Sequence, residues 1–270
     1  MKLPDKPIRC IHCCRPTESP EGDHVFPDSW YPDSTPPTVQ RWTAPSCPVC
    51  NRKFGQLEKD LLVRMVLCLD PKGAPTSGLA EKVFRSLGID VNGLPEREKE
   101  AREKLRSQLK SEFVPYAEVA DLPKIPGLGP SIDEEPQHAL FLPYAGLAMI
   151  AEKIARGCEY RYKNRRRYVE HPYGVRILVK GSGDVPGIFA DGEGLDFGPG
   201  CRVIRVWEPE IDPEAVCYWV SIWGALHMTV LIDLETNLLV VDKELKKSEG
   251  TLPPEDRAMQ VPSYLRDFSR

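Results

Sequence analysis

Four cysteines near the start of the chain form two C-x-x-C pairs, Cys10–Cys13 and Cys47–Cys50. Two such pairs can supply four thiolates to one tetrahedral zinc ion. Between the pairs lies the dipeptide Asp23-His24, and Asn51 directly follows the last cysteine. The spacing therefore predicts a metal-braced frame that holds a carboxylate, an imidazole and a carboxamide.

Zinc is one of several uses that such cysteines have. C-x-x-C pairs also act in thiol redox proteins, where the thiols must remain reactive rather than bound to metal. Cys14 can replace Cys13 as a ligand, and His12 lies inside the first pair; packing is the ordinary role of both. Structural zinc is the interpretation that uses all four paired cysteines together.

The three polar side chains also have chemistry of their own. Histidine titrates near neutral pH, so His24 can take up or give up a proton. The carboxylate of Asp23 and the amide oxygen of Asn51 are of the ligand types that hard divalent cations prefer. Each residue also has an ordinary structural role: strand histidine, turn aspartate and helix-capping asparagine.

The order C-x-x-C, Asp-His-Val-Phe-Pro, C-x-x-C-Asn before an amphipathic helix resembles the zinc-braced branch of the HNH endonucleases. That family has a ββα-metal core built on a treble-clef zinc finger, and the match covers about the first 70 residues. By resemblance, the four cysteines bind structural Zn²⁺, Asp23 and Asn51 bind a catalytic Mg²⁺ or Mn²⁺, and His24 is the general base. The implied activity is metal-dependent cleavage of nucleic acid, with DNA favoured over RNA.

The chain departs from the HNH pattern at two places. Trp42 stands where many members have an asparagine that orients the base. Phe54 and Gly55 stand where members often have a further metal ligand, so two protein ligands remain. A second hypothesis therefore stays open: a non-catalytic, zinc-dependent nucleic-acid-binding module on a degenerate HNH frame.

A net charge of −4 does not by itself indicate a nucleic-acid-binding protein. Attraction to phosphate would have to be local, and two groups of cations are candidates. The first group surrounds the proposed site and consists of Arg41, Arg52 and Lys53. The second lies between Tyr160 and Tyr168, where tyrosines suited to base stacking alternate with cations that include Arg165, Arg166 and Arg167. A solvated turn is the alternative for this second group.

Composition also predicts the compartment. Five of the nine cysteines are scattered outside the two pairs, as is typical of reduced intracellular thiols. No apolar run reaches the roughly 18 to 20 residues of a membrane span, and the first residues lack a signal-peptide core. We therefore expect a cytoplasmic protein with no membrane partner, and the sequence does not indicate its oligomeric state.

Hydrophobic patterning predicts an α+β fold in three regions. Residues 1–70 form the zinc-braced domain, residues 71–136 a helical connector with a Pro/Gly-rich linker, and residues 137–270 an α+β domain of unknown role. Helices are predicted over 51–68, 79–87, 95–113 and 144–156, the last capped by Gly157. A mostly antiparallel sheet is predicted from strands over 175–179, 201–206, 216–223, 227–233 and 238–242, with the Gly-rich segment 184–196 as a loop.

Overall fold

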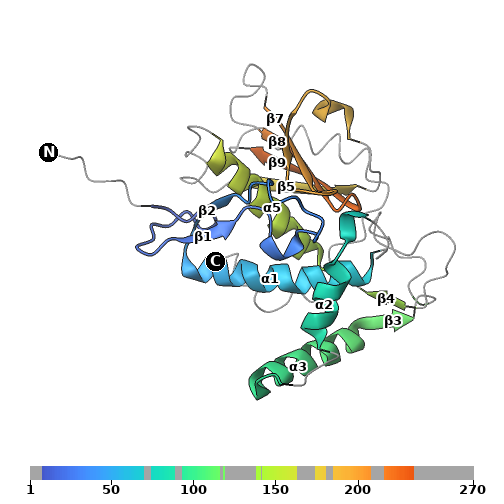
Figure 1. Cartoon of the computed structure of the whole chain (residues 1–270). Helices are drawn as coiled ribbons and strands as arrows, with labels where there is room; N and C mark the ends of the chain where they lie inside the picture. Colours follow the sequence, from blue (N-terminus) through green and yellow to red (C-terminus); the bar gives the residue numbers. More distant parts are fainter. Residues whose placement is uncertain are drawn as a thin grey trace.

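The structure, a computed structural model, describes residues 8–69, 74–88, 93–115, 118, 138–140, 142–162, 174–180, 185–207 and 216–233. Within these residues the chain forms helices and antiparallel sheets, which confirms the α+β prediction. Five of the strands form one sheet. Figure 1 shows helix α5 (Tyr144–Arg161) against this sheet and helix α1 (Pro48–Leu67) beside α5. None of the described helices combines the length and the apolar character that crossing a membrane requires.

A short hairpin and α1 build the region that contains the paired cysteines. Strand β1 (Glu21–His24) pairs antiparallel with β2 (Thr43–Ser46), and β2 leads directly into the helix. Cys47 is the N-cap of α1, and Pro48 occupies the first helical position, where a missing N–H leaves no hydrogen bond unmade. The helix therefore begins before Asn51, where the sequence predicted its start.

The apolar stripe predicted for α1 is confirmed. Its members are buried along the helix: Phe54, Leu57, Leu61 and Met65. Cys68, the last residue of the predicted stripe, is the half-buried C-cap. Side chains of Leu57 and Leu61 lie directly beside Gly146 of α5, so the stripe packs on that helix as well as on the hairpin.

Helix α5 is longer than predicted because Gly157 does not cap it. The helix continues through Gly157 to Arg161. A Cβ atom added at Gly157 would lie 2.7 Å from Cγ2 of Val25, which follows β1. Glycine is therefore needed at this position for close packing between helix and hairpin, and not for a left-handed turn.

The five strands beyond α5 form an antiparallel sheet in the order β5-β9-β8-β7-β6. Their bounds are Gly174–Lys180 for β5, Glu193–Asp196 for β6, Arg202–Val206 for β7, Val216–Ile222 for β8 and Leu226–Asp233 for β9. Four of these strands lie close to the predicted ranges, whereas the strand predicted over 238–242 falls outside the described residues. The loop predicted for 184–196 is wrong over β6. There the backbone groups form hydrogen bonds with β7, and local composition gives no sign of this pairing.

The two faces of this sheet have different environments. Side chains that alternate along β8, such as Tyr218 and Val220, belong to the main core together with α5. On the opposite face Trp219 packs with Ile204 and with Phe189 of the short helix η3 (Gly187–Phe189). The main core thus joins the sheet, α5, α1 and the hairpin.

Helices α2 (Leu79–Leu87) and α3 (Glu96–Glu112) occupy the connector, close to their predicted ranges. Only Leu109 of α3 is buried, in keeping with its charged sequence. Strand β3 (Phe113–Pro115) pairs with β4 (His138–Leu140). Most of the predicted linker between these strands lies outside the described residues.

Candidate zinc centre and the Asp23–His24 site

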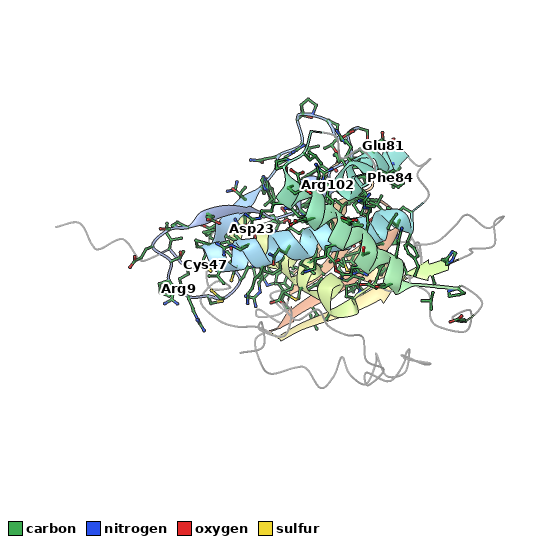
Figure 2. All side chains as sticks on the ribbon, turned by 90° about the horizontal axis from the view of Figure 1, so that it is seen from below. Arg9, Asp23, Cys47, Glu81, Phe84 and Arg102 are labelled. Carbon is green, nitrogen blue, oxygen red and sulfur yellow. The ribbon has the colours of Figure 1, made fainter. Side chains whose placement is uncertain are left out.

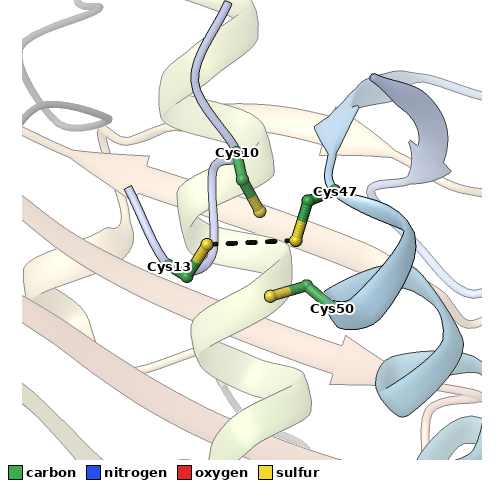
Figure 3. A group of neighbouring side chains, drawn as sticks. All are labelled: Cys10, Cys13, Cys47 and Cys50. Carbon is green, nitrogen blue, oxygen red and sulfur yellow. Dashed lines mark hydrogen bonds between the residues drawn. The ribbon is translucent and has the colours of Figure 1, made fainter. Parts of the chain in front are cut away.

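The four paired cysteines converge in space. One sulfur ligand atom from each of Cys10, Cys13, Cys47 and Cys50 lies within 4.8 Å of the others, and Figure 3 shows the four sulfurs turned toward a common point. The Sγ atoms of Cys13 and Cys47 are 3.9 Å apart. Tetrahedral zinc with Zn–S bonds of about 2.3 Å places its sulfurs about 3.8 Å apart. The donor set and its spacing therefore fit a structural zinc ion.

Local turn chemistry brings the first pair into position. The N–H of Cys14 donates to the carbonyl of Cys10, and Cys14 adopts a left-handed φ of 59°, which reverses the chain directly after Cys13. The N–H of Ile11 donates to the carbonyl of Pro45, which attaches this turn to the hairpin. Cys14 does not belong to the four-sulfur cluster.

Proximity of the thiols shifts their proton affinities. A hydrogen bond with the Cys50 thiol lowers the pKa of Cys10 to about 3, and the same contact raises the pKa of Cys50. Metal ions bind cysteine as the thiolate, and the lowered pKa of Cys10 favours that form.

Asp23 lies in a buried cluster of polar side chains. Its carboxylate oxygen Oδ2 is 2.8 Å from Nε2 of His12, and Oδ1 is 2.6 Å from Nζ of Lys153 on α5. Lys153 also contacts the carboxylate of Glu58 on α1. Figure 2 shows Asp23 toward the same end of α1 as Cys47, whereas Phe84 and Arg102 lie toward its other end.

The four members of this cluster are all largely withdrawn from solvent. The exposed fractions of their side chains are 4% for His12, 6% for Asp23, 13% for Glu58 and 1% for Lys153. Burial favours the protonated form of Asp23, but the hydrogen bond with His12 and the ammonium of Lys153 outweigh it and lower the pKa. Burial raises the pKa of Glu58 despite the same ammonium. Lys153 is therefore chiefly the counter-ion of Asp23.

His24 has a different environment from its neighbour Asp23. Its side chain is 38% exposed, and its Nε2 is 3.9 Å from Oδ1 of Asp28. That same oxygen accepts a hydrogen bond of 2.6 Å from Arg41. Adjacent strand residues point to opposite faces, so Asp23 faces the interior and His24 the surface. Asp28 is the carboxylate beside the proposed base, a role that the sequence analysis assigned to no residue.

Asn51 lies on the first turns of α1 but has a separate partner. Its Nδ2 donates to Oε2 of the exposed Glu21 at a distance of 2.6 Å. Among the contacts of the described residues, none joins Asn51 to Asp23 or to His24. The three predicted site residues thus share the hairpin and helix, but each side chain contacts different groups.

Trp42 occupies a packing position. Its ring lies edge-on to Phe197 at a centroid distance of 6.0 Å, and the guanidinium of Arg161 lies 5.8 Å from its ring centroid. The residue that stands in place of an orienting asparagine therefore connects the hairpin to α5 and to the segment after β6. Its indole N–H can donate a hydrogen bond but the ring has no acceptor, so it cannot accept from an imidazole N–H as an amide oxygen does.

The structure describes some of the cations that were predicted to contact phosphate. Arg41 is exposed, pairs with Asp28 and lies 4.7 Å from the ring centroid of Tyr31. Arg52 is exposed and Lys53 is half-buried on the first turns of α1. Three further candidates fall outside the described residues: Arg165, Arg166 and Arg167.

A catalytic divalent cation does not fit Asp23 as the structure places it. Both carboxylate oxygens already have partners, one of them a cation. A hydrated Mg²⁺ or Mn²⁺ keeps several waters, and a carboxylate that is 6% exposed has no room for them. The side-chain oxygen of Asn51 contributes no described contact to Asp23 that would complete such a site.

Four residues that contact Asp23, His24 or each other were given no role in the predicted site: His12, Glu58, Lys153 and Asp28. Glu58 could have been suspected from the sequence, because it is an acidic residue directly beside Leu57 of the apolar stripe. The contact of Lys153 with Asp23 could not, because 130 residues separate the two in the chain. Comparisons with protein-family models, curated proteins and solved structures found no match to this chain.

Proposed function

We propose that the chain is an HNH-type endonuclease, with a structural zinc on a treble-clef frame and His24 as the general base. The single observation that carries this proposal is the position of His24. A four-thiol centre braces the hairpin against α1, and the half-exposed imidazole lies at the end of β1, beside a carboxylate. The substrate class, nucleic acid with DNA favoured, follows from the resemblance of the motif order to the HNH family.

The chain's own residues account for part of a hydrolytic reaction. His24 is accessible to water and can accept its proton as the oxygen attacks phosphorus. Asp28 lies on the Nε2 side of the ring, 3.9 Å away, and Arg41 holds the same carboxylate oxygen in place. Arg52, exposed on the first turn of α1, supplies positive charge for a phosphate.

A bound Mg²⁺ or Mn²⁺ would neutralise the negative charge that develops on the leaving oxygen. Asp23 and Asn51 are the residues assigned to it by resemblance. The arrangement of Asp23 does not fit a hydrated cation, because both carboxylate oxygens already have partners.

One observation favours a second candidate function. The aspartate that would hold the catalytic cation is paired with a buried lysine instead. A zinc-braced module that binds nucleic acid without cleaving it would keep the frame and tolerate this pairing. On this alternative, Arg41, Arg52 and Lys53 contact phosphate, and His24 is an ordinary surface residue.

The decisive experiment incubates zinc-loaded protein with supercoiled plasmid in Mg²⁺, in Mn²⁺ and without added divalent metal. The nuclease proposal expects nicked or linear product, reduced roughly 10²- to 10⁴-fold in His24→Ala, as is typical for loss of a general base. Zinc content is measured after each incubation, because loss of the structural ion would itself abolish activity.

His138→Ala is the matched control, since His138 is an exposed histidine on β4 and belongs to neither cluster. Cleavage should remain unchanged in this variant. If the wild type and His24→Ala are equally inactive on plasmid and on RNA, the binding module is the better function. Fluorescence anisotropy with labelled DNA then tests it, with Arg52→Ala expected to weaken binding.

A further inference from the structure

The contacts of Lys153 place a protein-borne cation at Asp23. Its Nζ is 2.6 Å from Oδ1 of Asp23 and also contacts Oε1 of Glu58. The ring of Phe54 lies on another side, with its centroid 5.5 Å from Nζ. Two carboxylates and an aromatic face thus surround one ammonium group whose side chain is 1% exposed.

This arrangement is that of a cation site whose cation is supplied by the chain. Two carboxylate oxygens that converge on one point are the usual ligands of a hard divalent ion. Here the convergence point is taken by an ammonium that donates hydrogen bonds to both. His12 occupies the remaining oxygen of Asp23. A divalent ion at the same place would meet a buried like charge.

The packing of helix α5 fixes the position of the Lys153 backbone, so the ammonium group has little freedom to move away. Gly146 and Gly157 bring α5 close to α1 and to Val25, on either side of Lys153 along the helix. Arg156, one turn further, donates to the carbonyl of Ile11 at 3.3 Å. Withdrawal of the ammonium would therefore require the helix to move, or two carboxylates to remain buried without a counter-ion.

We propose that Lys153 is the resident cation of the Asp23–Glu58 site and excludes Mg²⁺ and Mn²⁺ from it. The site is then formed jointly by the hairpin, α1 and α5. This inference rests on the contacts of Lys153 and not on hydrolysis, so it stands or falls separately from the role of His24.

The test is a Mn²⁺ titration of zinc-loaded protein, followed by the electron paramagnetic resonance signal of free Mn²⁺. Wild-type protein should show no stoichiometric Mn²⁺ site that depends on Asp23. Lys153→Gln should bind one Mn²⁺ per chain, roughly tenfold or more tighter than wild type, since a buried like charge is gone. Adding Asp23→Asn to Lys153→Gln should abolish the gain.

Lys99→Gln is the matched control, because Lys99 pairs with Glu96 on an exposed part of α3. Its Mn²⁺ binding should equal that of wild type. The proposal is overturned if wild-type protein binds one Mn²⁺ that Asp23→Asn removes, or if folded Lys153→Gln gains no site. Circular dichroism and zinc content establish folding. If Lys153→Gln loses its zinc, Lys153→Met, which keeps both carboxylates, takes its place in the titration with the same expected gain.

Discussion

The ammonium of Lys153 lies 2.6 Å from the carboxylate of Asp23, although 130 residues separate them in the chain. A second cation of the same helix, Arg161, lies over the ring of Trp42. The predicted division into residues 1–70 and residues 137–270 thus assigns directly contacting side chains to different regions. Any chemistry at Asp23 depends on α5 as much as on the hairpin.

Loss of one cysteine of the cluster should abolish zinc binding and the folding of the region around it. Structural zinc contributes apparent binding free energies of about 10 to 16 kcal/mol, which matches or exceeds the whole stability of a typical domain. We therefore expect Cys50→Ser to lose zinc and its cooperative thermal transition. Metal analysis and calorimetry measure both. Cys68→Ser is the control, because Cys68 ends α1 outside the cluster; full zinc content in Cys50→Ser would contradict a four-thiolate site.

Two glycines inside helices should respond to alanine in opposite ways. Gly157→Ala places a methyl group 2.7 Å from a carbon of Val25, and such overpacking costs about 1 to 3 kcal/mol. Gly55→Ala in α1 meets no atom within 4 Å, so the better helix propensity of alanine should raise the free energy of unfolding by up to about 1 kcal/mol. Urea denaturation measures both. Equal effects would contradict the close contact between α5 and Val25.

Removing one partner of the buried ion pair between α5 and β7 should lower the free energy of unfolding strongly. Nε of Arg205 on β7 is 2.6 Å from Oε1 of Glu159, whose side chain is 0% exposed, and the hydroxyl of Tyr218 contacts the same oxygen. Arg205→Met removes the cation and leaves the carboxylate buried, which costs about 3 to 5 kcal/mol. Arg202→Met, at an exposed position of the same strand, should change stability by less than about 0.5 kcal/mol. A similar urea midpoint for both variants would show that Glu159 does not depend on Arg205.

Stability should fall at alkaline pH in part through Cys201. Burial raises the pKa of this thiol from 9.0 to about 12. Between these values the unfolded chain loses the proton while the folded chain keeps it, so the stabilisation present below pH 9 is lost progressively up to pH 12.

At pH 10.5 the loss attributable to Cys201 is about 2 kcal/mol, from about 1.4 kcal/mol per pH unit. Urea unfolding of wild type and Cys201→Ala at pH 8 and pH 10.5 measures it. The variant loses a hydrogen bond from the N–H of Trp223 at both pH values, so only the difference in pH dependence is diagnostic. An identical pH dependence in both proteins would contradict burial of the neutral thiol.

Predictions that depended on short-range patterns agree with the structure. The helix over Leu79–Leu87 has the predicted bounds, because its apolar spacing and Gly88, at a φ of 65°, are local signals. Gly157 was misinterpreted as a cap because the same residue type also permits close helix packing. Strand β6 was missed because its partner, and not its composition, makes it a strand. The catalytic roles of Asp23, His24 and Asn51 remain predictions.

Ligand spacing and hydrophobic period are recorded in neighbouring residues, so the four-cysteine cluster and the order of hairpin and helix around it could be predicted from the sequence. The contacts of Asp23 depend instead on the tertiary structure. Its cation comes from α5 and its second partner from the cysteine turn, and the low exposure that makes both pairings strong arises from packing of three separate segments. No spacing in the chain records such a convergence, since burial of a charge depends on what the rest of the molecule places against it.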